Sequence, residues 1–388
     1  MSLPIATEPV TPAPEGTSAN AVARLQQLFK GRSQQSVLVT IASSLGAVVI
    51  ALVLAGLLLW VTGKSPVEAY KKMLDAGLTN DKLLETVQRA TPLIVAAVAV
   101  AIGFKMNLFN IGVEGQYLMG VFWAAVVGAY VHLPSVLHIG LIFLVAMAAG
   151  ALWAAIPAIL KVKKGVNEVI ATIMLNTITL SIIDWTFQER FRHEIPGQLD
   201  VKTKLLPTTA WLPDLVKNRL SSFVFVALVV VVVFWLIVYK SKFGFRLRAS
   251  GANAIAARTA GISSNNMIVT SMVMSGAIAG LAGMTYLLGT SHAYGPTRPD
   301  GYGFNGIAVA LLGRNHPAGI IVAGLLWGFL DSVSGPLQIA NIPQSIVLVI
   351  KAIILLTVVI VNEVVGRRVA KRTADRTAAQ LTLPVVAA

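Results

Sequence analysis

Residues 220–239 read LSSFVFVALVVVVVFWLIVY, a run of twenty positions without a charged side chain. A helix of about 20 apolar residues crosses a hydrocarbon core of roughly 30 Å. Backbone groups in lipid must pair within the protein, so only helices and closed barrels cross a membrane. Barrel strands alternate apolar and polar residues, whereas this run is continuously apolar. The stretch therefore predicts a membrane-spanning helix.

The rest of the chain repeats this pattern. Of the 388 residues, 56% are hydrophobic and only 12% are charged, too few for the surface of a soluble domain of this length. We therefore predict an all-α integral membrane protein with about ten transmembrane helices. The segment 304–313 is too short to span alone, so it predicts a half-helix or broken crossing enclosed by protein. The remaining predicted spans are 37–61, 87–104, 117–132, 136–160, 167–187, 266–289, 317–333 and 342–362.

The basic residues, which give a formal net charge of +14, stand between the apolar runs. Cytoplasmic loops of membrane proteins are rich in Lys and Arg, so this placement does not call for a nucleic-acid partner. With the N-terminus inside, the basic loops 161–164 and 240–264 and the C-terminal tail fall inside. The nearly balanced loops 63–89 and 188–219 then fall outside. We expect an N-in, C-in protein of a bacterial-type cytoplasmic (inner) membrane.

Three parts are expected along the chain. Residues 1–36 are polar and rich in Pro, Ala and Thr, which predicts a cytoplasmic tail without a core of its own. Residues 37–365 form the membrane domain, and residues 366–388 form a basic cytoplasmic tail. The absence of Cys excludes a disulfide framework and thiolate metal sites. The five His residues are scattered, so no metal site is predicted.

The most informative loop is 244–262, GFRLRASGANAIAARTAGI. Its Ala-rich part, 254–260, predicts a short helix. Asn253 is a good N-cap, and Gly251 and Gly261 bracket the stretch as helix breakers.

Small side chains such as Ala256 and Ala257 would let this helix lie closely in a groove of another protein. A short exposed helix that follows basic residues is typical of a segment that docks on an ATPase. An ordinary positive-inside loop is the alternative interpretation of the same residues.

Two distant regions of the chain share a short sequence pattern, and the proposed topology has them running in opposite directions. Such an arrangement is typical of inverted repeats, whose interrupted helices face a substrate path. An inverted repeat is therefore one interpretation of this chain. The first region has Gly103-Phe104 followed by Asn107, Asn110, Gly112 and Gly115, and the second has Gly303-Phe304 followed by Asn305 and Gly306.

Four motifs, in order, resemble the ABC permeases for simple sugars and nucleosides, a family that includes ribose and branched-chain amino acid permeases. The resemblance covers roughly 37–365, and the form NIGVEGQ, residues 110–116, looks most like the nucleoside branch. That form is part of the first motif, NLFNIGVEGQ at 107–116, and the other three are GVNEVI at 165–170 with Asn176, the loop 244–262, and GFNGIAVALLGRNHP at 303–317.

The resemblance implies the permease subunit of an ABC importer, moving a small polar solute such as a nucleoside by alternating access. Implied partners are an ABC ATPase, a second permease subunit (identical or different), an extracytoplasmic binding protein and membrane lipid. ATP and Mg would be bound by the ATPase, and no cofactor by this chain. No Gly-x-x-x-x-Gly-Lys-Ser/Thr motif is present, so we predict no catalytic site.

Two sets of candidate residues follow. An ionisable group at membrane depth is costly and is a functional candidate, and amides suit a neutral solute rich in hydroxyls and ring nitrogens. These groups could instead cap broken helices, and Asn176 could join helices. The substrate-path candidates are Asn107, Asn110, Glu114, Gln116, Asn176 and Asn305, and the ATPase-coupling candidates are Arg246, Arg248, Gly251, Asn253, Ala256, Ala257, Arg258 and Gly261.

Two further features concern packing and charge. Gly276 and Gly280 form a small-xxx-small pattern, which predicts close helix packing within the chain. Lys351 lies within the last predicted span, where it would pair with a carboxylate or line a cavity.

Two other functional classes remain as alternatives. An ion-coupled secondary transporter would need relay residues in several spans, and few exist beyond Glu114, Asp184, Asp331 and Lys351. A membrane-embedded enzyme would need a cluster of catalytic side chains at one depth, and none is evident from the sequence. A ribose-like sugar permease is the alternative within the resembled family.

Overall fold

The computed structural model describes residues 46–194, 201–339 and 342–381. These residues form two compact units, one made of 46–54 with 356–381 and the other of 55–355. The expected polar tail 1–36 and the start of the first predicted span lie outside the described residues.

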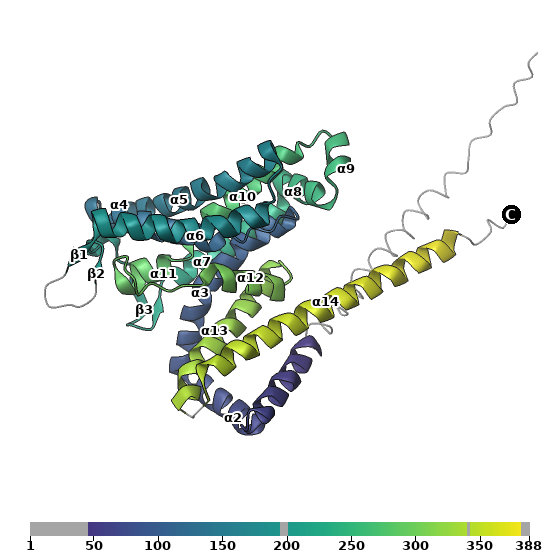
Figure 1. Cartoon of the computed structure of the whole chain (residues 1–388), viewed down its shortest axis with the longest axis horizontal. Coiled ribbons are helices and arrows are strands. Elements are labelled where there is room, and N and C mark those ends of the chain that lie inside the picture. Colours follow the sequence, from purple (N-terminus) through teal and green to yellow (C-terminus); the bar gives the residue numbers. More distant parts are fainter. Residues whose placement is uncertain (1–45, 195–200, 340–341, 382–388) are drawn as a thin grey trace, which may run out of the picture. The chain divides into compact units, whose positions relative to one another are not determined.

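Helices make up most of the described chain, as predicted (Figure 1). Helix α6, helix α7 and the short α11 each continue into a π-helical turn, namely η1 (Phe187–Phe191), η3 (Leu236–Lys240) and η4 (Leu287–Ser291). The helices are α2 (Pro66–Gly77), α3 (Asn80–Lys105), α4 (Val113–Tyr130), α5 (Ser135–Lys164), α6 (Glu168–Thr186), α7 (Phe223–Trp235), α8 (Lys242–Ala252), α9 (Ala254–Thr259), α10 (Ser264–Leu281), α11 (Met284–Tyr286), α12 (Tyr302–Leu312), α13 (Pro317–Ile339) and α14 (Gln344–Leu381), with a 3-10 turn η2 (Thr208–Ala210).

Seven helices of the described chain are long and apolar enough to cross a membrane. They are α3, α5, α6 with η1, α7 with η3, α10 through η4, α13, and α14 as far as Val369. An eighth is reached if the helix Gly46–Val61 and α2 form one broken span.

The predicted number of about ten is larger because it counted 117–132 and 304–313 as further segments. Both are helical, but α12 has only 11 residues. Helix α4 begins with a polar first turn that contains Glu114 and Gln116. Each of the ten predicted segments lies mainly on a helix over its described residues.

Helix α3 is the core of the unit 55–355, because it packs against α7, α10, α12 and α13. Every residue from Ala90 to Gly103 is buried. The small Ala side chains of this stretch let neighbouring backbones approach closely. A Cβ atom added at Gly306 of α12 would lie 2.6 Å from the Cβ atom of Ala96.

Helices α5 and α10 meet along glycines. A Cβ atom added at Gly150 would lie 2.2 Å from the carbonyl oxygen of Gly276, and one added at Gly276 would lie 2.4 Å from the carbonyl oxygen of Gly150. One added at Gly280 would lie 2.0 Å from the carbonyl oxygen of Ala146. The predicted small-xxx-small packing within the chain is therefore confirmed.

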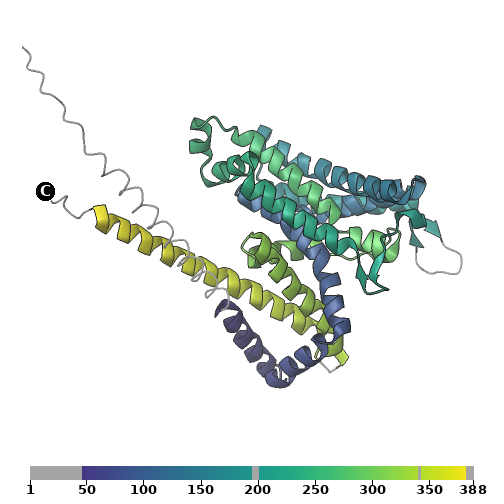
Figure 2. The same cartoon turned by 180° about the vertical axis from the view of Figure 1, so that it is seen from behind.

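The two ends of the long helices differ within the unit 55–355. Helices α8 and α9 lie at one end, and the strand pairs lie at the other, as both views show (Figures 1 and 2). Strands β1 (His193–Glu194) and β2 (Val201–Lys202) pair antiparallel, as do β3 (Asp214–Val216) and β4 (Leu220–Ser221). We call the end with the strand pairs the hairpin end and the other the basic end.

Candidate functional site

The carboxylate of Glu114 joins α4 to α12. Its Oε1 accepts a hydrogen bond from the backbone N–H of Gly301, and its Oε2 accepts one from that of Gly303, each at 2.7 Å. Both N–H groups belong to the start of α12, where helical N–H groups lack intrahelical partners and the helix dipole is positive. The buried acid therefore caps α12 from another helix, which explains how its charge is accommodated.

Helices α4 and α12 touch at this point without an intervening side chain. A Cβ atom added at Gly303 would lie 2.3 Å from the backbone nitrogen of Glu114. The two regions that share the Gly-Phe pattern in the sequence are therefore in contact in the structure. The inverted repeat itself stays a prediction.

Residues 292–301 form a non-helical connection from η4 to α12. The hydroxyl of Tyr117 on α4 donates a hydrogen bond to the carbonyl of Pro299. The Tyr117 and Tyr302 rings lie 5.6 Å apart between centroids. Helix α4 therefore packs against the non-helical backbone of this connection.

The same connection carries polar groups that sequence reasoning missed. Tyr294 is 1% exposed, and its hydroxyl has no partner within the described chain. The guanidinium of Arg298 lies 5.3 Å from the centre of the Tyr294 ring, and its buried Nε makes no hydrogen bond in the described chain but forms an ion pair with the Oδ1 of Asp300 at 3.6 Å. The signal was present as GPTRPDG at 295–301, in which helix breakers flank charges between two apolar runs.

Asn110 and Gln116 form a closed amide pair. The Asn110 Nδ2 donates to the Gln116 Oε1 at 2.9 Å, and the Gln116 Nε2 donates to the Asn110 Oδ1 at 3.0 Å. Asn110 also donates to the hydroxyl of Ser275 at 2.9 Å, and Ser275 donates to the carbonyl of Ala99 at 2.6 Å. The chain of bonds links α4, α10 and α3.

Asn176 on α6 binds the first turn of α4. Its Oδ1 accepts from the N–H of Gly115 at 2.9 Å, and its Nδ2 donates to the carbonyl of Ile111 at 3.0 Å. The Oδ1 of Asn110 also accepts from the N–H of Gly112 at 3.1 Å. Side chains from two other segments therefore satisfy N–H groups at the start of α4, where no intrahelical partner exists.

The other two substrate-path candidates lie elsewhere. Asn107 is exposed in the turn after α3 and has a left-handed backbone with φ of 59°, a conformation that Asn tolerates better than most residues. Asn305 is half-buried on α12, and its Oδ1 accepts a hydrogen bond from the Trp327 Nε1 at 3.0 Å. The structure thus joins Asn110, Glu114, Gln116 and Asn176 at the start of α4 and separates Asn107 from them.

Lys351 on α14 finds its carboxylate on α13. Its Nζ pairs with the Oδ1 of Asp331 and lies 5.4 Å from the centre of the Trp327 ring. The Lys351 side chain is 7% exposed, against 33% for Asp331. Of the two roles left open by the sequence, pairing with a carboxylate is the one observed.

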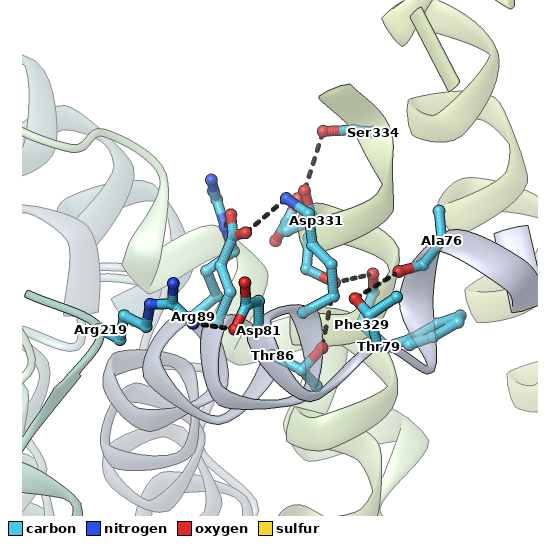
Figure 3. A network of polar contacts seen from close by, with 12 residues as sticks. Ala76, Thr79, Asp81, Thr86, Arg89, Arg219, Phe329, Asp331 and Ser334 are labelled. Atoms are coloured by element: carbon cyan, nitrogen blue, oxygen red, sulfur yellow. Dashed lines mark hydrogen bonds and ion pairs between the residues drawn. The ribbon is translucent and has the colours of Figure 1, made fainter. Parts of the chain in front are cut away.

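A network of polar contacts continues from Asp331 toward the start of α3 (Figure 3). The Ser334 hydroxyl donates to the carbonyl of Asp331 at 2.8 Å. The hydroxyls of Thr86 and Ser332 lie 3.0 Å apart and join α3 to α13. Arg219, just before β4, pairs with Asp81 in the first turn of α3. The polar contacts fix α3 and α13 at their hairpin ends.

The predicted short helix at the basic end exists. Helix α9 spans Ala254–Thr259, and the Asn253 Oδ1 accepts from the N–H groups of Ile255 and Ala256, each at 3.0 Å. Gly261 after it has φ of 76°, as expected of a glycine that ends a helix. Residues before it, which we expected to be loop, form the additional helix α8.

The coupling candidates divide into exposed and buried groups. Gly251 lies against the end of α3, because a Cβ atom added there would lie 2.5 Å from the carbonyl oxygen of Lys105. Arg248 is half-buried, with its guanidinium 5.5 Å from the centre of the Tyr239 ring. Ala257 is 4% exposed, so it faces the chain itself. The exposed members are Arg246, Asn253, Ala256, Arg258 and Gly261.

Residues 83–361 match the family model described as the permease component of a branched-chain amino acid transport system. The chain belongs to this permease family. The match confirms the resemblance predicted from the four motifs, and the permease is a multi-pass membrane protein.

Three curated relatives resemble this permease over 80% of its length. They are the guanosine ABC transporter permease protein NupP of Bacillus subtilis, 38% identical and covered to 91%, the nucleoside ABC transporter permease protein NupB of Lactococcus lactis, 34% identical and covered to 88%, and the glucose ABC transporter permease protein TsgB13 of Haloferax volcanii, 33% identical and covered to 84%. No solved structure shows a significant match to the chain.

Proposed function

We propose that this permease is the membrane subunit of an ABC importer that carries nucleosides across the cytoplasmic membrane. The observation that carries the proposal is its similarity to the guanosine and nucleoside permeases, at 38% and 34% identity over 80% of the chain. The chain would not hydrolyse ATP, because ATP and Mg would bind to a partner ATPase.

The basic end would face the cytoplasm. The support is charge: α8 and α9 carry Lys242, Arg246, Arg248 and Arg258 without an acidic residue, and basic segments stay on the cytoplasmic side. The N-terminus and C-terminus would then both lie inside. The hairpin end would face outward, where an extracytoplasmic binding protein delivers the solute.

Helix α9 would dock on the ATPase. It is short, capped by Asn253 and exposed over Ile255, Ala256 and Arg258, with Ile255 77% exposed. The buried face at Ala257 would transmit motion of α9 to α10, which α9 contacts. A second permease subunit, identical or different, would complete the pathway.

The side-chain amides of the first motif and of Asn176 would join helices to one another rather than bind the solute. The support is that Asn110, Gln116 and Asn176 have hydrogen-bond partners in the protein. The solute path would instead run beside the connection 292–301, where the buried hydroxyl of Tyr294 has no hydrogen-bond partner in the described chain and the buried Nε of Arg298 makes only an ion pair with Asp300. Alternating access would alter the contact of α4 with α12 at Glu114.

The test is a solute panel. The permease, its ATPase and its binding protein are reconstituted in proteoliposomes, and uptake of labelled guanosine is measured with unlabelled competitors. Guanosine and uridine should compete at lower concentrations than ribose, glucose or leucine. The glucose permease relative makes glucose the informative alternative. Glucose competing best would assign the protein to sugar transport and contradict the proposal.

A further inference from the structure

A cavity of about 450 Å³ opens at the hairpin end. It lies between Gln88 on α3, the segment from Trp211 to Ser221, and the end of η4 with His292. Its volume falls within the roughly 300–1,000 Å³ that is typical of small-molecule sites. None of the residues predicted from the sequence to bind solute lines it.

One wall is a stacked pair of rings. The Trp211 and His292 rings lie 3.8 Å apart between centroids, at an angle of 12°. Leu206 holds both, because its N–H donates to the carbonyl of His292 at 2.8 Å and its carbonyl accepts from the Trp211 Nε1 at 3.2 Å. The indole N–H is therefore already bonded, and what the side chain offers the cavity is apolar ring surface. Trp211 is 41% exposed.

His292, which lines the cavity, has an unusual backbone conformation and an unpaired ring nitrogen in the described chain. Its φ of 53° is left-handed, a conformation that costs energy in residues other than glycine. Its Nδ1 is buried without a partner in the described chain. Burial lowers the pKa of the imidazole, although the Asp214 carboxylate opposes this effect. The ring is therefore neutral at pH 7 and has one donor and one acceptor nitrogen.

Polar groups complete the lining. The Oε1 of Gln88 accepts from the N–H of Ser221 at 3.0 Å, which leaves the amide nitrogen as a donor. Asp214 accepts from the N–H of Asn218 at 2.8 Å through one oxygen and has a second oxygen as an acceptor. The Thr290 hydroxyl donates to the carbonyl of Tyr286 at 3.0 Å and can accept another bond.

We propose that the cavity between Trp211, His292, Gln88 and Asp214 is an entry subsite that holds the planar base of a nucleoside. The inference rests on the proposed function for its class of solute. A base would stack on the indole face, and stacking serves purines and pyrimidines alike because each has a flat ring face. Hydroxyls of the ribose would donate to the Asp214 carboxylate. The solute would then pass from His292 to Tyr294 along the connection 292–301.

The test measures binding of tritiated guanosine to the permease–ATPase complex in nanodiscs, by equilibrium dialysis without the binding protein. Trp211→Ala should weaken binding about tenfold, equivalent to about 1.4 kcal/mol and within the range for a stacked base. Trp211→Phe keeps a flat ring and should stay within about threefold of wild type. Trp185→Ala, a change at a 63% exposed Trp on α6, is the control and should bind normally. Light-activated 8-azidoguanosine should label peptides that contain Trp211 or His292.

Equal affinity in wild type and Trp211→Ala, or labelling confined to other peptides, would overturn the inference. The inference would also be overturned if Trp211→Ala changed only the concentration of binding protein needed for half-maximal uptake. The cavity would then be a docking site for the binding protein. In each case guanosine uptake by the wild-type complex would still support the proposed function. Absence of nucleoside uptake by that complex would instead overturn the proposed function.

Discussion

At the residue scale, the polar groups buried in the first motif bind other parts of the protein. Glu114 accepts two N–H groups from the start of α12, and Asn176 accepts one from α4. A buried N–H group left without an acceptor costs roughly 1–3 kcal/mol. These side chains therefore allow helices to begin inside the bundle, where water cannot satisfy the first turn.

Glu114→Ala should destabilise the protein by about 2–6 kcal/mol, because it leaves two N–H groups without an acceptor at roughly 1–3 kcal/mol each. Glu114→Gln keeps one acceptor oxygen and should lose about half as much. Thermal unfolding in detergent measures the order. Glu189→Gln, at an exposed acid in η1, is the control and should unfold like wild type. Equal stability of wild type and Glu114→Ala would refute the capping role.

Asp331 and Lys351 should depend on each other. Lys351→Met or Asp331→Asn leaves one charge without its partner and should cost about 1–3 kcal/mol, below the 3–5 kcal/mol of a fully buried pair because Asp331 is one-third exposed. The double variant removes both charges and should be more stable than either single variant. A double-mutant cycle on the unfolding midpoint measures this coupling. Additive losses would show that the pair contributes no interaction.

The sequence predicted which residues are unusual here, but not what they bind. Glu114 stood out because a charge at membrane depth is costly, yet its partners at Gly301 and Gly303 lie nearly 190 positions away. Nothing in the order of residues fixes that contact. Tyr294 was missed because only a folded chain shows which buried polar atoms lack a hydrogen-bond partner.

At the scale of elements, glycine contacts decide how the helices pack. Backbones of α5 and α10 touch at Gly150, Gly276 and Gly280. Packing of this kind needs close approach, since lipid offers no hydrophobic drive for one helix to associate with another. The pattern at Gly276 and Gly280 was visible in the sequence, whereas the partner Gly150 was not.

Gly280→Ala should destabilise the bundle, since the new Cβ atom would lie 2.0 Å from the carbonyl oxygen of Ala146. Overpacking typically costs about 1–3 kcal/mol. Gly140→Ala on α5 is the matched control, because no atom lies within 4 Å of its added Cβ atom, and it should gain up to about 1 kcal/mol of helix propensity. The unfolding midpoints of the two variants test the close contact between α5 and α10. A neutral Gly280→Ala would contradict close contact there.

Helix α9 allows a test of coupling that spares the fold. Ala256 is exposed, so Ala256→Trp should change the unfolding free energy by no more than about 0.5 kcal/mol. In the reconstituted complex it should reduce ATP hydrolysis stimulated by loaded binding protein at least tenfold. Ile339→Trp, at an 87% exposed site of α13, is the control and should keep full stimulation. Full stimulation of Ala256→Trp would remove α9 from the ATPase contact.

At the scale of the whole molecule, composition and charge predicted the class of protein. The number of membrane crossings was harder to predict from the sequence. The apolar runs predicted helices, and helices occupy those positions. Within the described residues, fewer helices than the predicted ten are long and apolar enough to cross, because a short helix such as α12 is apolar but has only 11 residues and packs against α3 and α13. Length and surroundings, rather than hydrophobicity, separate the two cases.

The most direct test of the central claim follows guanosine into proteoliposomes that contain the permease, its ATPase and its binding protein. ATP is supplied only on the side where single-Cys labelling of Arg246→Cys locates α8, and no ion gradient is applied. We predict that guanosine accumulates inside the compartment that holds the ATP, against its own gradient, and that accumulation stops without ATP. Accumulation driven by a proton or sodium gradient without ATP would contradict the account and identify a secondary transporter.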